Sequence, residues 1–358
     1  MSDHPIVDIN MFVYNGEDTV GAAIECVLAQ TWPAWRLTVM DDGSTDKTAE
    51  IIADFSNRFP FIRAIKHRHN GGAVASFQRA FWHGDADFVM PKSGDDLLAP
   101  DFIEKIMAVL LTHPATAMCH AGGLVFGGQA DIRALYPPSH RLHAVGPDRL
   151  ARAQGVMARY TSSPGFWGVY RRDAVDRLAR IRYRAGWDHA LLAELALYGE
   201  IRHVADPLYW RRDGGKPVLA LARSATERGG RGLNVDDPIT EPHWRTPLLT
   251  TVLAHLETFS VARVTAPERD WLWQSTIEIF RSRWLPAMQR ECATLRAATP
   301  AILDAVKFGN SVRSAWVKRE LDSLLAIAEL VMPASALVGT PEISKPRIAD
   351  QTRATEVA

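Results

Sequence analysis

Apolar runs of strand length alternate with segments of helical spacing over the first third of this 358-residue chain. The runs predicted as strands are Ile6–Val13, Trp35–Met40, Ile62–Lys66, Asp87–Met90 and Thr116–Phe126. Helices are predicted at Asp18–Gln30, Ala73–Trp82 and Asp101–Thr112. A further helix is predicted between the second and third strands, with Ser44 or Thr45 as its N-cap and its end near Phe59. This alternation predicts an α/β fold with a Rossmann-like, mostly parallel sheet and helices on both faces. Right-handed crossovers would then place the carboxyl ends of the strands along one edge.

The pattern loosens after Gly127 and becomes almost purely helical towards the C-terminus. We expect a loop at Gln129–Pro147, helices at Arg149–Tyr160 and Ala190–Tyr198, a turn and aromatic strand at Thr161–Tyr170, a strand at Ile201–Val204 and a polar loop at Ser224–Asp237. Residues 247–332 read as helical and the last residues as a disordered tail. The predicted domains are 1–238, with halves at about 1–127 and 128–238, a C-terminal helical appendage at 239–337 and a tail at 338–358.

Composition excludes several classes of protein. The chain has 41 basic and 41 acidic side chains, so its formal net charge of zero gives a nucleic-acid partner no electrostatic support. Its three cysteines lie far apart, which favours buried free thiols over a disulfide scaffold. We find no signal peptide at the N-terminus and no apolar segment long enough to span a bilayer. These features predict a cytoplasmic protein.

Three predicted strand ends carry unusual side chains. Tyr14 and Asn15 follow the first strand, Asp41 and Asp42 the second, and the pair Asp95-Asp96 follows the fourth. In an open α/β sheet ligands bind at this edge. Carboxylates are hard oxygen donors suited to Mg²⁺ or Mn²⁺ shared with a diphosphate. Helix capping is the alternative interpretation of each acidic turn, and the convergence of all three favours the ligand site.

Five segments of the chain resemble family 2 glycosyltransferases of the GT-A fold. They are YNGE at 14–17, DDGSTDKT at 41–48, NGG at 70–72, SGDDLLAPDF at 93–102 and WDHALLAELALYG at 187–199. The resemblance covers about residues 5–215 and leaves the C-terminal helices unmatched. It implies transfer of a sugar from a nucleotide diphosphate sugar to an acceptor hydroxyl, with inversion at the anomeric carbon. The same resemblance makes bacterial-type surface polysaccharide or glycolipid assembly the expected pathway.

The resemblance also assigns roles to the matching residues. Asp96 would be the direct ligand of a divalent metal, with Asp95 near the metal or the sugar, and Asp188 would be the general base. Asp42 would accept from the nucleobase imino N–H beside Asp41, which makes a UDP-sugar the preferred donor. Tyr14 would stack on the base, Asn15 belongs to the same turn, and Gly72 would let the backbone approach the nucleotide closely. Arg211 or Arg212 would either reach the diphosphate as a charge-assisted donor or form a surface salt bridge.

The chain departs from the family pattern at several of these places. Phe12-Val13 stands where the family has Pro-Thr, and Ser93 where it commonly has Asp. Phe77-Gln78 replaces an Arg-Asn pair, and Arg79 is expected to face elsewhere on its helix. Trp187 takes the place of an acidic residue before the base, and Arg211-Arg212-Asp213 replaces an Arg followed by His.

Other residues have two open interpretations. Phe166, Trp167 and Trp187 either line an acceptor pocket or pack in the core. The C-terminal helices are rich in aromatic residues and arginines and include Trp271 and Trp284. Their aromatic side chains either form the core of a helical bundle or make a peripheral contact to the inner membrane face. The acceptor would be a saccharide or a lipid-linked saccharide located there. These helices could also pair two copies into a homo-oligomer. His67-Arg68-His69 lacks a third ligand and is not predicted as a metal site. Two rival functions remain: a catalytically degenerate scaffold and a nucleotidyltransferase.

Overall fold

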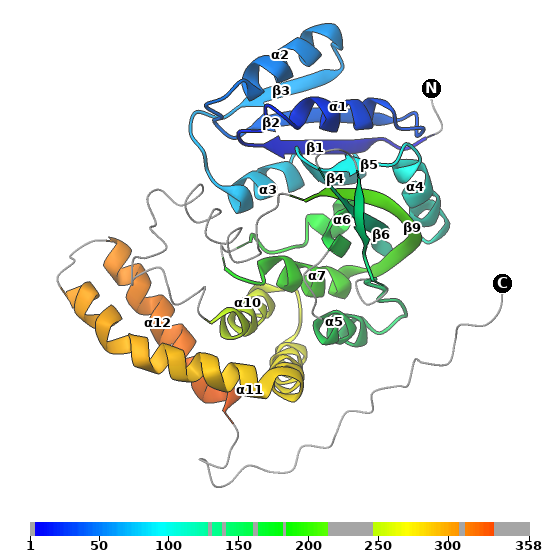
Figure 1. The fold of residues 1–358 in the computed structure, drawn as a ribbon. Helices are drawn as coiled ribbons and strands as arrows, with labels where there is room; N and C mark the ends of the chain where they lie inside the picture. Colours follow the sequence, from blue (N-terminus) through cyan, green and yellow to red (C-terminus); the bar gives the residue numbers. More distant parts are fainter. Residues whose placement is uncertain are drawn as a thin grey trace.

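A computed structural model describes residues 4–127, 131–137, 141–159, 164–181, 184–213, 246–307 and 312–332. The predicted loop at 224–237 and tail at 338–358 lie outside these residues. The first strands and helices occur where the hydrophobic pattern predicts them (Figure 1). They are β1 (Val7–Val13), α1 (Val20–Leu28), β2 (Trp35–Asp41), α2 (Thr48–Arg58), β3 (Ile62–Lys66), α3 (Ala73–Phe81), β4 (Phe88–Ser93) and α4 (Phe102–Thr112).

The sheet is parallel in its first half and mixed in its second. Strands β3, β2, β1 and β4 lie side by side and run parallel. The second half adds β5 (Leu97–Leu98), β6 (Thr116–Phe126), β7 (Ile132–Leu135), β8 (Gly168–Arg171) and β9 (Glu200–Arg212). Among the described strands of this half, the β6–β9 pair is parallel, whereas β4–β8, β6–β8, β5–β9 and β6–β7 are antiparallel. The prediction of a mostly parallel sheet therefore holds only for the first half of the sheet, since periodicity does not reveal strand direction.

Two strands differ from their predicted extent. Strand β7 lies inside the segment predicted as a loop. Strand β9 continues to Arg212, eight residues past the predicted Val204, although Asp206-Pro207 interrupts its sequence. The pairing of β9 with β6 shifts register around Gly122, opposite this interruption. A bulge allows a proline inside a strand, so the strand continues past Pro207 instead of ending before it, as the prediction had it.

Helices cover both faces of the sheet, as predicted. Helices α1 and α4 pack on one face around Ile24 and Phe102. The other face carries α3, α5 (Arg149–Ala158), α6 (Arg172–Val175) and α7 (Trp187–Tyr198), with the short 3₁₀ turn η2 (Pro164–Phe166). Successive side chains of β4 point to opposite faces of the sheet. Phe88 and Met90 pack in the core under α1 and α4, and Val89 packs in the core on the opposite face. Cys119 and Cys292 are buried and Cys26 is half-buried, all as free thiols.

The C-terminal residues form three helices, of which α10 lies beside α7 while α11 and α12 pack on α10 (Figure 1). They are α10 (Pro247–Val261), α11 (Ala266–Lys307) and α12 (Val312–Val331). Helix α11 breaks at Trp284, two residues before Pro286, whose ring cannot follow a regular turn. Phe280 is fully buried and the Trp273 indole donates to the Leu256 carbonyl oxygen, which favours the bundle-core interpretation of these aromatics. Within the described ranges, no helix combines the length and the apolar character needed to cross a membrane.

Candidate active site

The three chemically unusual turns meet at one edge of the sheet, as predicted. In the parallel register Val13 pairs with Asp41, and Phe12 pairs with Ser93. Just beyond these pairs, the Asp42 N–H donates to the Val13 carbonyl oxygen at 2.8 Å and the Gly94 N–H donates to the Phe12 carbonyl oxygen at 3.0 Å. Backbone hydrogen bonds thus hold the turns after β1, β2 and β4 together.

Asn15 joins the first turn to the second. Its φ of 48° is the single positive value of a non-glycine residue in the described chain, in a region that asparagine tolerates. Its Oδ1 accepts from the Thr45 N–H at 2.9 Å, and its own N–H donates to the Ser44 hydroxyl at 2.9 Å. The predicted capping role of Ser44 or Thr45 is therefore wrong, because α2 begins at Thr48 and these side chains bind the neighbouring turn instead.

Asp42 organises the glycine turn that precedes α3. Its buried carboxylate accepts from the N–H groups of Gly71 and Gly72 at 2.9 and 3.0 Å, and from the Arg79 guanidinium at 2.7 Å. Gly72 has a φ of 88°, which favours glycine at this helix start. The expectation that Arg79 faces elsewhere is wrong: Arg79 lies on the side of α3 that faces Asp42, so its guanidinium points back to the site.

Asp41 differs from Asp42 in having an unsatisfied oxygen. Its Oδ1 accepts from the Ser44 N–H at 2.9 Å. Its Oδ2 is buried and has no hydrogen-bond partner among the described residues. A buried acceptor without a donor is destabilising, so a ligand N–H that reached it would gain a strong contact.

Asp96 is buried and turned towards β9. Its carboxylate, 5% exposed, accepts from the Tyr209 hydroxyl and from the Arg212 N–H at 2.9 Å. Burial and the neighbouring charge of Asp95 raise its pKa to about 7. Asp95 is exposed instead, and the Ser93 hydroxyl donates to its Oδ1. Where the family commonly has a third acidic residue, Ser93 thus orients the outward-facing carboxylate.

Lys92 and Tyr209 support this turn and were missed by the sequence reasoning. The Lys92 ammonium is fully buried and donates to the carbonyl oxygens of Asp96 at 2.6 Å and Ser93 at 3.0 Å. A lysine inside an apolar strand just before an acidic turn is a signal that could have identified it. Tyr209 gave no such signal, since its partner lies 113 residues away.

An aromatic cluster connects the acidic turn to the start of α7. Trp167 stacks on Tyr209, with ring centroids 5.9 Å apart and planes 6° from parallel. Trp187 packs against Phe166 and Phe77 at 5.2 and 5.0 Å. Phe166 is buried, and Trp167 and Trp187 are half-buried. Of the three predicted acceptor residues, only the two tryptophans offer partly accessible rings.

Asp188 lies in the first turn of α7, directly after Trp187. Gly186, with a φ of 76°, is the N-cap residue just before this helix. Asp188 is partly buried, and the loss of hydration raises its pKa. Its Oδ1 accepts from the His189 N–H at 3.0 Å. A carboxylate whose basicity is increased by burial can serve as a general base.

The remaining predicted residues lie around the same edge. Tyr14 is half-buried in the turn after β1. Arg211 is exposed near the end of β9, and its side chain hydrogen-bonds with Tyr136. Arg212, rather than Arg211, contacts the acidic turn, because its Nε donates to the Asp95 carbonyl oxygen at 3.0 Å. No three His, Cys, Asp or Glu side chains of the described residues gather closely enough to hold a metal by themselves.

Comparison with known proteins gives consistent matches. Residues 8–178 match the profile of Glycosyl transferase family 2. "Putative glycosyltransferase EpsE" of Bacillus subtilis (strain 168) is 33% identical over 127 residues, which are 35% of this chain and 46% of EpsE. "UDP-Glc:alpha-D-GlcNAc-diphosphoundecaprenol beta-1,3-glucosyltransferase WfgD" of Escherichia coli is 29% identical over 116 residues, 32% of this chain and 45% of WfgD. The chain thus spans just under half the length of these two relatives.

A solved structure extends the likeness to the whole fold. The structure of S. aureus TarS 1-349 in complex with UDP-GlcNAc superimposes with a TM-score of 0.56 at 15% identity, over 90% of each chain. At that identity the likeness concerns the fold alone: an α/β sheet of GT-A type followed by a C-terminal helical region. Residues 8–178, just under half of the chain, are thus similar to glycosyltransferase family 2.

Proposed function

We propose that this protein transfers a sugar from a UDP-sugar to an acceptor hydroxyl, with inversion, in the synthesis of a cell-surface polysaccharide or glycolipid. The observation that carries the proposal is the meeting of three strand-end turns at one edge, which puts Asn15, Asp41-Asp42 and Asp95-Asp96 on adjacent parallel strands. The UDP-GlcNAc complex of TarS supports the donor class, and the activity in WfgD's name supports the pathway.

On the donor side, the nucleotide would lie across the first two turns. Tyr14 would stack on the base, and the unsatisfied Asp41 Oδ2 offers an acceptor for the imino N–H. Asp42 already binds Gly71, Gly72 and Arg79, so we assign it the shaping of the pocket. The Gly72 backbone would approach the nucleotide, and Arg211 would neutralise charge on the diphosphate.

A divalent cation, Mg²⁺ or Mn²⁺, fits this edge as a partner of the diphosphate. Such ions often bind one or two carboxylates and complete their shell with phosphate oxygens and water. The exposed carboxylate of Asp95 is open to such an ion, and Asp96 could join it while the Tyr209 hydroxyl continues to donate to its Oδ2. When bound, the ion would stabilise negative charge on the leaving diphosphate.

On the acceptor side, Asp188 would accept the proton of the attacking hydroxyl. The acceptor oxygen forms a bond to the anomeric carbon while the bond to the diphosphate oxygen breaks, and the electron pair leaves with the diphosphate. Attack from the face opposite the leaving group inverts the configuration. The half-buried rings of Trp167 and Trp187 would pack on the saccharide part of the acceptor. We also propose that the protein acts in the cytoplasm and contacts the membrane peripherally where a lipid-linked acceptor resides. Pairing of two copies through the C-terminal helices stays a prediction.

Calorimetric titration of UDP with Mn²⁺, and then with EDTA, tests this proposal. We expect binding that is lost with EDTA and in Asp95→Ala. Asp101→Asn is the matched control, because Asp101 is an acidic residue of the same segment that pairs with Lys105. Release of UDP from a panel of UDP-sugars would then establish turnover. Absence of binding to UDP, GDP and dTDP would overturn the proposal in favour of a degenerate scaffold.

A further inference from the structure

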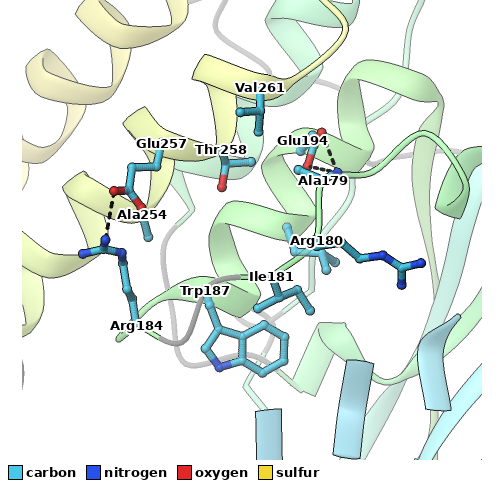
Figure 2. A pocket seen from close by; sticks show the side chains of 11 residues that line it. Ala179, Arg180, Ile181, Arg184, Trp187, Glu194, Ala254, Glu257, Thr258 and Val261 are labelled. Atoms are coloured by element: carbon cyan, nitrogen blue, oxygen red, sulfur yellow. Dashed lines mark hydrogen bonds and ion pairs between the residues drawn. The ribbon is translucent and has the colours of Figure 1, made fainter. Parts of the chain in front are cut away.

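The segment that leads into Asp188 is tied to the C-terminal helices by a buried ion-pair cluster. The Arg184 guanidinium donates to Glu257 of α10 at 2.9 Å and to both carboxylate oxygens of Glu320 of α12, at 2.5 and 3.0 Å. The Arg184 side chain is 6% exposed. Figure 2 shows Arg184 reaching Glu257 beside Trp187. One buried guanidinium therefore couples two C-terminal helices to the residues immediately before α7.

Gly186 gives a second contact to the same helices. An added Cβ at this position would lie 2.3 Å from the Thr251 hydroxyl oxygen of α10. That hydroxyl is itself fixed, because it donates to the Pro247 carbonyl oxygen at 2.7 Å. Both the left-handed backbone and the close approach require glycine here. Helix α10 therefore packs directly on the N-cap residue of α7.

His189 gives a third contact, on the far side of Asp188. Its Nδ1 lies 2.9 Å from Nε2 of His255 in α10, and both rings are buried. A hydrogen bond between two imidazoles needs one nitrogen as donor and the other as acceptor, which fixes both ring orientations. The backbone N–H of the same His189 donates to the Asp188 carboxylate. Contacts from the C-terminal helices thus flank Asp188 on both sides.

We propose that α10 and α12 position Asp188 for catalysis, with Arg184 as the central positioning residue. The inference rests on the proposed function, in which Asp188 is the general base. It makes the C-terminal helices part of the catalytic unit, although they lie outside the matched family region. The cavity between α7 and α10, lined by Trp187, Arg184 and Glu257 (Figure 2), has a volume of only about 30 Å³. It holds one or two waters at most, so this contact serves packing and orientation rather than ligand binding.

The matched test compares two arginines that both tie the α/β part to the C-terminal helices. Arg149 of α5 pairs with Glu268 of α11 through a bidentate contact at 2.6 Å, away from Asp188. In the full chain, Arg184→Met should speed hydrogen exchange of the amides of residues 187–190, and Arg149→Met should not. With UDP-N-acetylglucosamine or UDP-glucose as donor and water as acceptor, Arg184→Met should lower the kcat of UDP release about 10- to 100-fold and leave the Kd for UDP within twofold.

Two further variants keep the test decisive. Arg184→Lys retains the charge and should recover part of the lost turnover. Glu320→Gln preserves the shape of the cluster and should show a smaller effect in the same direction, which covers the case in which Arg184→Met does not fold. Equal loss of turnover in the Arg149 and Arg184 variants would overturn the inference. Unchanged hydrogen exchange of residues 187–190 in Arg184→Met and Glu320→Gln would also overturn it.

Asp188→Asn separates this inference from the proposed function. Full turnover in that variant would overturn the role of Asp188 as general base, and the hydrogen-exchange result for Arg184 would still hold.

Discussion

The Tyr209 hydroxyl donates a hydrogen bond to the buried carboxylate of Asp96, although 113 residues separate the two in the chain. The Arg212 N–H donates to the other oxygen of the same carboxylate. Strand β9 therefore closes over the acidic turn and determines which of its two carboxylates faces outwards.

Tyr209→Phe should weaken UDP binding in the presence of Mn²⁺ by about tenfold at pH 7, equivalent to about 1.4 kcal/mol. The hydroxyl stabilises the ionised form of Asp96, so its loss should raise the pKa of Asp96 above about 7 and leave it protonated. Calorimetry at pH 7 and pH 8.5 checks this, since the higher pH should restore much of the affinity. Tyr170→Phe is the control, because it removes another buried hydroxyl whose partner is the Phe166 carbonyl oxygen. Equal losses in the two variants would argue against a specific role for Tyr209.

Asp188→Asn should lower the kcat of UDP release by about 10²- to 10⁴-fold, the usual contribution of a general base. UDP affinity should stay unchanged, because the proposed nucleotide contacts lie on the turns after β1 and β2. Steady-state turnover and calorimetry on the same preparations separate the two effects. Asp173→Asn, at an exposed position of α6, is the control. A parallel fall in UDP affinity would place Asp188 in donor binding instead.

Asn15→Ala should lower both stability and UDP affinity. Alanine loses the acceptor for the Thr45 N–H and disfavours the φ of 48°, at a combined cost of about 1–2 kcal/mol. Asn15→Gly keeps the backbone conformation and should be intermediate, and Asn15→Asp keeps the acceptor and should be mildest. Urea unfolding and UDP titration of the three variants measure this order. If glycine and alanine behave alike, the side-chain hydrogen bond accounts for the effect and the backbone conformation does not.

Glu194→Gln should remove part of the pH dependence of stability. Glu194 is buried in α7, where it accepts from the Ala179 N–H, and burial raises its pKa to about 7. A carboxyl whose pKa is raised on folding stabilises the fold fully below its unfolded pKa of 4.5, and this contribution is lost as the pH rises through about 7. The loss is on the order of 3 kcal/mol at most. Urea unfolding at pH 5 and pH 8 should show a smaller difference in the glutamine variant than in the parent, and equal differences would contradict the assignment.

The family departures acquire a physical reason only in three dimensions. Phe12 stands at a family proline position and Phe77 at a family arginine position. The two rings pack edge to face with centroids 6.2 Å apart, and both join the cluster around Trp167. Taken alone along the chain, Phe77 looks like the loss of a charged contact to the diphosphate. Together the two rings form one apolar wall beside the site, which accounts for their joint occurrence.

Local pattern was sufficient for the elements of the first half and for the edge at which the acidic turns meet. Strand and helix periods depend on neighbouring residues, and parallel strands joined by short helical crossovers bring their carboxyl ends together. Asp41-Asp42 and Asp95-Asp96 could therefore be placed in one site from the amino-acid order alone. Which oxygen of these carboxylates is satisfied could not be inferred, because the donors come from Arg79, Tyr209 and Arg212, whose positions depend on long-range packing. The antiparallel entry of β8, the bulged extension of β9 and the contact of α10 with the start of α7 were likewise decided by tertiary structure, since no local period encodes strand direction or the partner of a distant helix.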